Sequence, residues 1–95
     1  MRVISQDGKI DVPYDYFSLS VASGKYEDVE VAYIYCHNLS SPNGTKLAEY
    51  STKAKAIKAM EMLRKAWINE AIEFTHGIYH RNIIFQFPQD DEIEV

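Results

Sequence analysis

The chain has 95 residues, of which 46% are hydrophobic and 25% charged, and its net charge is −4. This composition is typical of a folded globular protein and argues against intrinsic disorder. The length allows one domain with a thin core, which argues against a large enzyme fold with a deep pocket. The acidic balance argues against a general nucleic-acid binder, because such proteins usually carry a basic patch.

The sequence gives no sign of export or of a membrane span. Residues 1–5 contain one positive charge and no long apolar run, so we expect no signal peptide. Charged residues interrupt the longest helical stretch at short intervals, which excludes a transmembrane helix. The single cysteine, Cys36, lies in an apolar run, and we expect a buried free thiol in a cytoplasmic protein.

The first quarter of the chain predicts a hairpin and a strand. Asp7-Gly8 separates two β-prone segments, residues 2–5 and 9–14, and favours a two-residue hairpin turn with positive φ. Residues 16–22 alternate between apolar and small side chains, which predicts a half-buried strand. We expect the chain to turn next at Ser23-Gly24-Lys25.

The next segment predicts the middle of the sheet. Residues 29–36 are apolar on both faces over most of their length, which indicates a central strand covered on two sides. Residues 38–45 are expected to form a loop with Asn43-Gly44 as its turn. Residues 46–50 then predict a short strand.

The second half predicts a long helix and one returning strand. The helix is expected to begin after an N-cap at Ser51 or Thr52 and to run to about Thr75. The alternative is a helix that breaks near Asn69. Residues 82–87 predict the last strand. We therefore predict an α+β fold in which an antiparallel sheet of about five to six short strands packs against this helix. The single domain would span residues 1–88, followed by a loose acidic tail at residues 89–95.

The helix carries apolar residues outside the stripe that should face the sheet. That stripe contains Ala56, Met60, Leu63, Trp67, Ala71 and Phe74. Met62 and Ile72 lie off the stripe, and Ile68 lies at its margin. We interpret these three residues as the interface of a homodimer or higher homo-oligomer, most simply a twofold dimer. The alternatives are that the tail or a loop covers them, or that the outer face of the central strand supplies the interface.

The sequence contains no motif for catalysis or for metal binding. His76 and His80 have the spacing of two ligands on a helix, but Gly77 indicates that the helix has ended, and no third ligand stands nearby. No nucleophile elbow and no glycine-rich phosphate loop is present. We therefore expect a protein that is not an enzyme and that has no metal and no cofactor.

One region combines residue types that suit a nucleotide. Aromatic rings stack on bases, Arg pairs with phosphate, and the Asn amide can read a base edge. The candidate ligand-binding residues are Phe74, His76, Tyr79, Arg81 and Asn82. The alternative is that the aromatic residues belong to the core and the polar residues only solvate a loop.

Three stretches carry a resemblance to a group of small proteins encoded by phages and prophages of Firmicutes. They are residues 1–8 with the following Pro13-Tyr14, residues 48–52 leading into residues 56–64, and residues 85–92. The order of elements is also similar to that of the phage anti-Thoeris sponge proteins, which assemble as dimers or larger oligomers and sequester cyclic ADP-ribose-type signals. This resemblance implies that Phe74 stacks on adenine and that Asn82 and Arg81 hold ribose and pyrophosphate.

The resemblance implies a non-enzymatic phage protein in the host bacterial cytosol that sequesters a nucleotide immune signal, either cyclic ADP-ribose-like or a cyclic oligonucleotide. We expect neither bulk nucleic acid nor a membrane as a partner. Two other readings stay open. The protein could be an interaction module that masks a host enzyme, or a small phage assembly component. A convergent pocket would favour a ligand, and a flat apolar patch would favour a protein partner.

Overall fold

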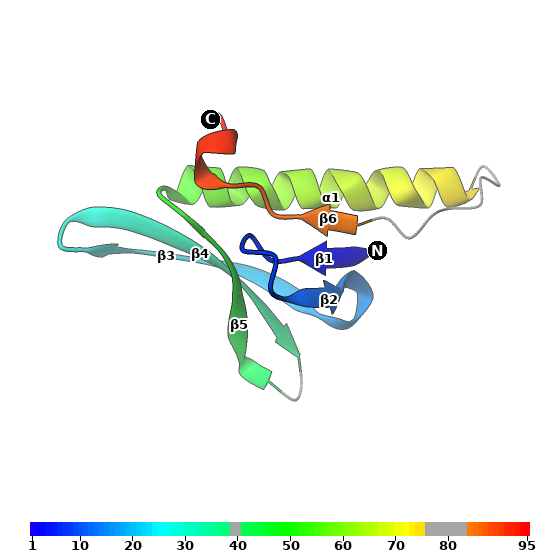
Figure 1. Cartoon of the computed structure of the whole chain (residues 1–95), viewed down its shortest axis with the longest axis horizontal. Helices are drawn as coiled ribbons and strands as arrows, with labels where there is room; N and C mark the ends of the chain where they lie inside the picture. The colour runs from blue at the N-terminus through cyan, green and yellow to red at the C-terminus, as the bar shows by residue number, and fades with distance from the viewer. Residues whose placement is uncertain (39–40, 76–83) are drawn as a thin grey trace.

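The computed structural model describes residues 1–38, 41–75 and 84–95, with side chains for all of these except residues 41–42 and 70–75. These ranges form two three-stranded sheets, in the orders β2-β1-β6 and β3-β4-β5, and one long helix (Figure 1). The elements are β1 (Arg2–Ile4), β2 (Asp11–Pro13), the 3-10 turn η1 (Tyr14–Tyr16), β3 (Ser18–Tyr26), β4 (Val29–Asn38), β5 (Ser41–Tyr50), α1 (Lys53–Thr75), β6 (Ile84–Gln86) and the 3-10 turn η2 (Asp90–Glu92). The predicted α+β class, with a final strand after the helix, is confirmed.

The N-terminal hairpin forms around the predicted Asp7-Gly8, where Gly8 has a φ of 77°. Its connection is longer than two residues, because the strands end at Ile4 and resume at Asp11. The Asp7 carboxylate accepts hydrogen bonds from the Ser5 hydroxyl at 2.6 Å and from the Lys9 amide at 3.0 Å. The bond from Ser5 is the main reason why the pKa of Asp7 lies below its usual value.

The turn between β3 and β4 lies later than predicted. Ser23-Gly24-Lys25 belongs to β3, and the chain reverses at Glu27 and Asp28, whose φ angles are 50° and 64°. The Gly24 signal for a turn was misleading because all nine residues of β3 pair in regular register with β4. The resulting hairpin extends as an arm beyond the rest of the molecule (Figure 1).

The predicted loop at residues 38–45 is also wrong in part, because Asn43 and Gly44 lie inside β5. The pairing of β4 with β5 shifts register twice, so the sequence signals for a turn mark irregular strand pairing instead. Leu47 is the extra residue at one shift, and its carbonyl accepts a hydrogen bond from the Gln6 amide at 2.8 Å. This bond connects the N-terminal hairpin to the larger sheet.

The central strand β4 is buried on one face and not on two as predicted. Ala32, Ile34 and Cys36 point into the core. On the opposite face Tyr33 and Tyr35 are half-buried, with ring centroids 6.0 Å apart. The sequence pattern overestimated burial here because tyrosine is apolar enough to resemble a core residue yet tolerates a partly solvated sheet surface.

The helix begins as predicted and is continuous to Thr75, without the optional break near Asn69. The Thr52 hydroxyl accepts a hydrogen bond from the Lys55 amide at 3.1 Å, as an N-cap side chain does. The Glu30 carboxylate accepts a second bond from the Lys53 amide at 2.8 Å, which joins β4 to the helix start. Ala56, Ala59 and Leu63 form the buried face of the helix.

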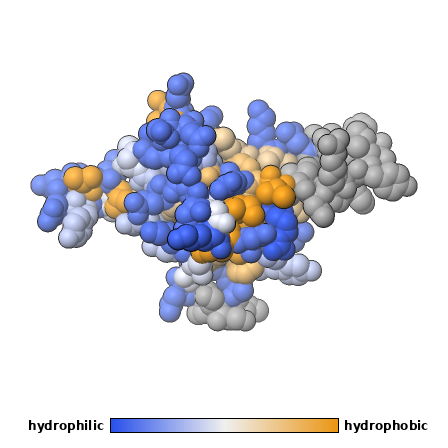
Figure 2. Space-filling model, viewed as in Figure 1, coloured by the Kyte–Doolittle hydropathy of each residue, from blue (hydrophilic) through white to orange (hydrophobic). Residues whose placement is uncertain are grey.

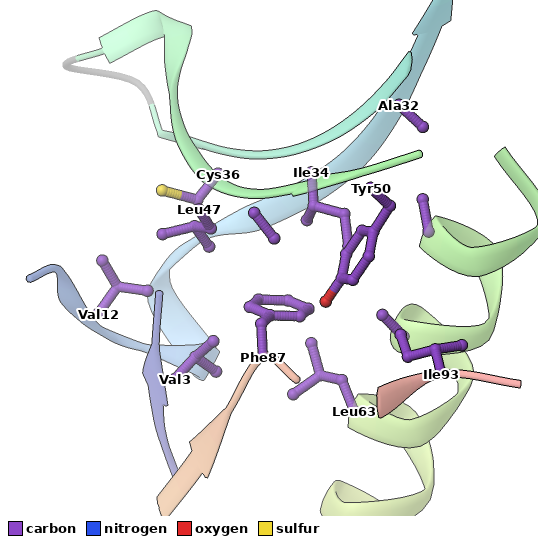
Figure 3. Close-up of a cluster of buried hydrophobic side chains, with 13 residues drawn as sticks. Val3, Val12, Ala32, Ile34, Cys36, Leu47, Tyr50, Leu63, Phe87 and Ile93 are labelled. Carbon is purple, nitrogen blue, oxygen red and sulfur yellow. The ribbon is translucent and has the colours of Figure 1, made fainter. Parts of the chain in front are cut away.

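The hydrophobic core lies between α1, the inner face of the larger sheet and the small sheet (Figure 3). Its largest side chains include Tyr50, Ile34, Leu63 and Phe87. The buried Tyr50 hydroxyl donates a hydrogen bond to the Pro88 carbonyl at 2.8 Å. Burial, together with the nearby carboxylates of Asp90 and Glu92, raises the pKa of Tyr50 far above its usual value.

The last residues are not a loose tail. Ile93 is buried in the core, and η2 is closed by reciprocal hydrogen bonds between Gln89 and Glu92. The Asp90 carboxylate accepts from the Ser51 amide at 2.7 Å and from the Lys55 ammonium group at 3.2 Å. The acidic composition predicted a solvated tail, but the carboxylates of Asp90 and Glu92 accept hydrogen bonds from specific donors.

The pairing of the last strand also differs from the predicted antiparallel sheet. Strand β6 pairs parallel to β1, because the chain returns beside β1 after the long helix.

Candidate functional site

Most of the ligand-binding residues predicted from the sequence lie outside the described residues. This holds for His76, Tyr79, Arg81 and Asn82. Phe74 is part of α1, but its side chain is among those that are not described. Their role in binding a nucleotide therefore stays a prediction.

The residues predicted to form a dimer interface are partly described. Met62 and Ile68 expose 38% and 50% of their surface, as expected for positions outside the buried stripe of α1. Ile72 lies in the helix, and its side chain is not described. The exposure of the first two residues agrees with their predicted place on the helix, and the partner that would cover them stays a prediction.

An open pocket of about 350 Å³ lies between η1, the start of β3 and the middle of α1. Tyr14 and Asp15 of η1 line it, together with Phe17 and the first residues of β3. Met60, Arg64 and Trp67 line it from α1, because positions four and seven residues apart share one face of a helix. The complete lining is Tyr14, Asp15, Phe17, Ser18, Leu19, Met60, Arg64 and Trp67.

Two large aromatic side chains meet at this pocket. The ring centroids of Tyr14 and Trp67 are 6.1 Å apart, and the ring planes are tilted by 39°. The Tyr14 amide donates to the Met1 carbonyl at 3.1 Å, which holds η1 beside the small sheet. Trp67 nevertheless leaves 43% of its surface exposed. An exposed tryptophan beside a hollow is a ready surface for stacking a flat ring.

The lining of the pocket contains two charged side chains. Arg64 and Asp15 are both exposed lining residues. A guanidinium group binds carboxylate or phosphate oxygens through two parallel hydrogen bonds. The pocket thus combines aromatic surface with one group that suits an anion and one that suits a hydroxyl or an amine.

The sequence does not predict this pocket. The apolar stripe places Trp67 on the buried face of the helix. The missed signal was the position of Trp67 more than one helical turn beyond Leu63, where a small domain has little core left to cover a large ring. The contact with Tyr14 is long-range, and no local pattern predicts it.

Hydrophobic residues are also exposed elsewhere. Figure 2 shows a hydrophobic area over β1 and β6, and Ile84 of β6 exposes 65% of its surface.

The described residues contain no group of three potential metal ligands among His, Cys, Asp and Glu. In the same part of the chain, no helix combines the length and the apolar character needed to cross a membrane.

Comparison with protein-family models, with curated proteins and with solved structures gives no match to this chain.

Proposed function

We propose that the protein is a non-enzymatic binding protein that sequesters a small ligand with a flat ring and a negatively charged group, as in a nucleotide. The observation that carries this proposal is the pocket in which the Tyr14–Trp67 pair lies beside Arg64. Its volume of about 350 Å³ lies in the range of small-molecule sites. The site accommodates one base and its adjoining phosphate more readily than a whole oligonucleotide.

Each part of the ligand would meet a different lining residue. A base would stack on Trp67, because part of this ring is not covered by the core and is exposed. A phosphate would pair with Arg64, and a ribose hydroxyl or base amine would donate to Asp15. The charge of −4 disfavours long polyanions, so affinity would come from these local contacts.

Sequestration requires tight binding and no chemical step. A protein of this kind lowers the free concentration of a signal, so that the effector which reads the signal is not activated. The resemblance to phage proteins suggests a role against host defence, with a cyclic ADP-ribose-like compound or a cyclic oligonucleotide as the ligand. The aromatic pocket supports the ligand class, and the biological role rests on that resemblance.

The proposal is tested by melting the protein with a panel of cyclic ADP-ribose isomers and cyclic di- and trinucleotides. A ligand present at 100 times its dissociation constant stabilises the folded state by about 2.7 kcal/mol. We expect such a shift with at least one phosphorylated compound and a smaller shift with the corresponding nucleoside. The absence of a shift across the whole panel would contradict the proposal.

Two variants locate the site. Arg64→Gln should weaken binding of the phosphorylated ligand roughly tenfold or more, because charge-assisted hydrogen bonds contribute about 1.5–3 kcal/mol each. Lys65→Gln removes a neighbouring exposed charge that does not line the pocket and should leave affinity unchanged. Equal losses of affinity in both variants would show that binding depends on net charge and not on the pocket, which would contradict the proposed site.

A second candidate function is binding to a protein partner. The hydrophobic area over β1 and β6, with Ile84 exposed, favours it (Figure 2). This candidate predicts that Ile84→Lys abolishes an interaction while the melting panel gives no shift. The aromatic pocket is the more specific feature, so it favours binding of a small ligand over binding of a protein partner.

A further inference from the structure

The edge strand β3 has an unusual combination of length and regularity. It spans nine residues, and each of them pairs with β4 without a register shift. In the part of the chain that the structure describes, β4 is the only strand that pairs with β3. The backbone groups on the other side of β3 therefore form an unpaired row that another strand could extend.

The two edges of the larger sheet differ in how well they resist such pairing. Strand β5 contains Pro42, Gly44 and two register shifts against β4, all of which hinder the addition of a strand. Strand β3 contains no proline and no bulge, and Lys25 near its end is its only charged residue. Proteins usually protect long edges with such devices, so an unprotected β3 indicates an edge that is used.

We propose that β3 pairs with β3 of a second copy of this chain, antiparallel across a twofold axis at Ala22. The two three-stranded sheets then become one continuous sheet, with both helices on the same side. The register centred on Ala22 is the one that pairs all nine residues of the strand. This inference concerns assembly and does not depend on the proposed ligand.

Side-chain size favours a second copy as the occupant. On the outer face of the sheet this register sets Ser20 opposite Gly24 and Ala22 opposite its own equivalent. The small side chains at the axis cause no steric clash between the two copies. On the inner face Lys25 lies opposite Leu19, so no like charges face each other across the junction.

The end of the strand would lie near the pocket of the second copy. The same register places the acidic turn, Glu27 and Asp28, alongside residues 16–17 of the other copy. That segment adjoins the pocket, where one cation and one anion, Arg64 and Asp15, are exposed. Tyr26, which exposes 74% of its surface in one copy, would lie beside Ser18 of the second copy. The arm of each copy would thus border the pocket of the other.

The first test uses a cysteine at the axis. In a Cys36→Ala background, Ala22→Cys should form a disulfide-linked dimer under mild oxidation, because only a residue on the axis faces its own equivalent. Thr45→Cys, at an exposed position on β5, is the matched control and should remain uncrosslinked. Equal crosslinking of both variants, or none at Ala22→Cys, would overturn the proposal.

The second test uses charge reversal and sedimentation without ligand. Wild-type protein should sediment as a dimer, and Ala22→Lys or Ala22→Glu alone should raise the dissociation constant roughly tenfold or more, because like charges would face each other. An equimolar mixture of the two variants should restore the dimer, which misfolded protein would not do. A monomeric wild type, or a dimer disrupted by Ile68→Glu and not by Ala22→Lys, would overturn the proposal. Because no ligand is present, this result is independent of the melting panel.

Discussion

Asp90 shows how single residues fix the end of this chain. Its carboxylate accepts hydrogen bonds from the amide and hydroxyl of Ser51 and from the Lys55 ammonium group, at 2.7–3.2 Å. The bond from the Ser51 amide is the main reason why the pKa of Asp90 lies below its ordinary value of 3.8. The sequence shows only a run of acids and cannot reveal which of them has donors, because these donors lie 35 or more positions away.

Replacing Asp90 should therefore give a pH-dependent loss of stability. Asp90→Asn removes the charge, and we expect a loss of up to about 1 kcal/mol at neutral pH, since the site is partly exposed to water. A lowered pKa in the folded state means that the contribution is complete above the unfolded value of about 3.8. It is lost as the pH falls through the lower folded value. Melting curves from pH 7 to pH 2 should show the two proteins converging below about pH 4. Asp91→Asn, at an exposed carboxylate, is the control, and an equal loss there would contradict this account.

The strands show which local signals can be read from sequence and which cannot. The N-terminal hairpin, the β4 strand, the helix start and the last strand follow from alternation, Gly8 and the Thr52 cap, because these signals act over a few residues. The position of the β3–β4 turn depends on which pairing gives the longest ladder of hydrogen bonds. For this reason the turn signal at Gly24 was misleading, and the chain turns at Glu27-Asp28. Asn43-Gly44 likewise marks irregular pairing within β5, which depends on its neighbour β4.

The two glycines of the larger sheet should respond differently to substitution. Gly44 has a φ of 85°, and a Cβ there would lie 2.6 Å from the His37 ring, whereas a Cβ at Gly24 would meet open space. Gly44→Ala should lower the free energy of unfolding by about 1–3 kcal/mol, because strain and steric contact add. Gly24→Ala should be neutral or stabilising by a few tenths of a kcal/mol. Denaturant titration measures both, and equal effects would refute the assigned strand geometry.

For the whole molecule, the architecture can be predicted from the sequence better than the site can. The apolar stripe of the helix, which includes Ala56 and Leu63, together with the strand patterns, is enough to predict a sheet packed on one long helix. The pocket arises where Trp67 extends past the core and meets Tyr14 from a distant turn, and only the tertiary arrangement creates that contact. The long-range pairing of β6 with β1 escapes local patterns for the same reason.

The most direct test of the proposed site uses the fluorescence of Trp67, which is the only tryptophan of the chain. Because this ring lines the pocket, a nucleotide that stacks there must change its emission, and a nucleotide that binds elsewhere leaves it nearly unchanged. We predict saturable quenching by a phosphorylated ligand, weakened in Arg64→Gln and retained in Lys65→Gln, after correction with free tryptophan in a parallel titration. Binding shown by equilibrium dialysis without a change in Trp67 emission, or no binding by any compound of the panel, would contradict this account.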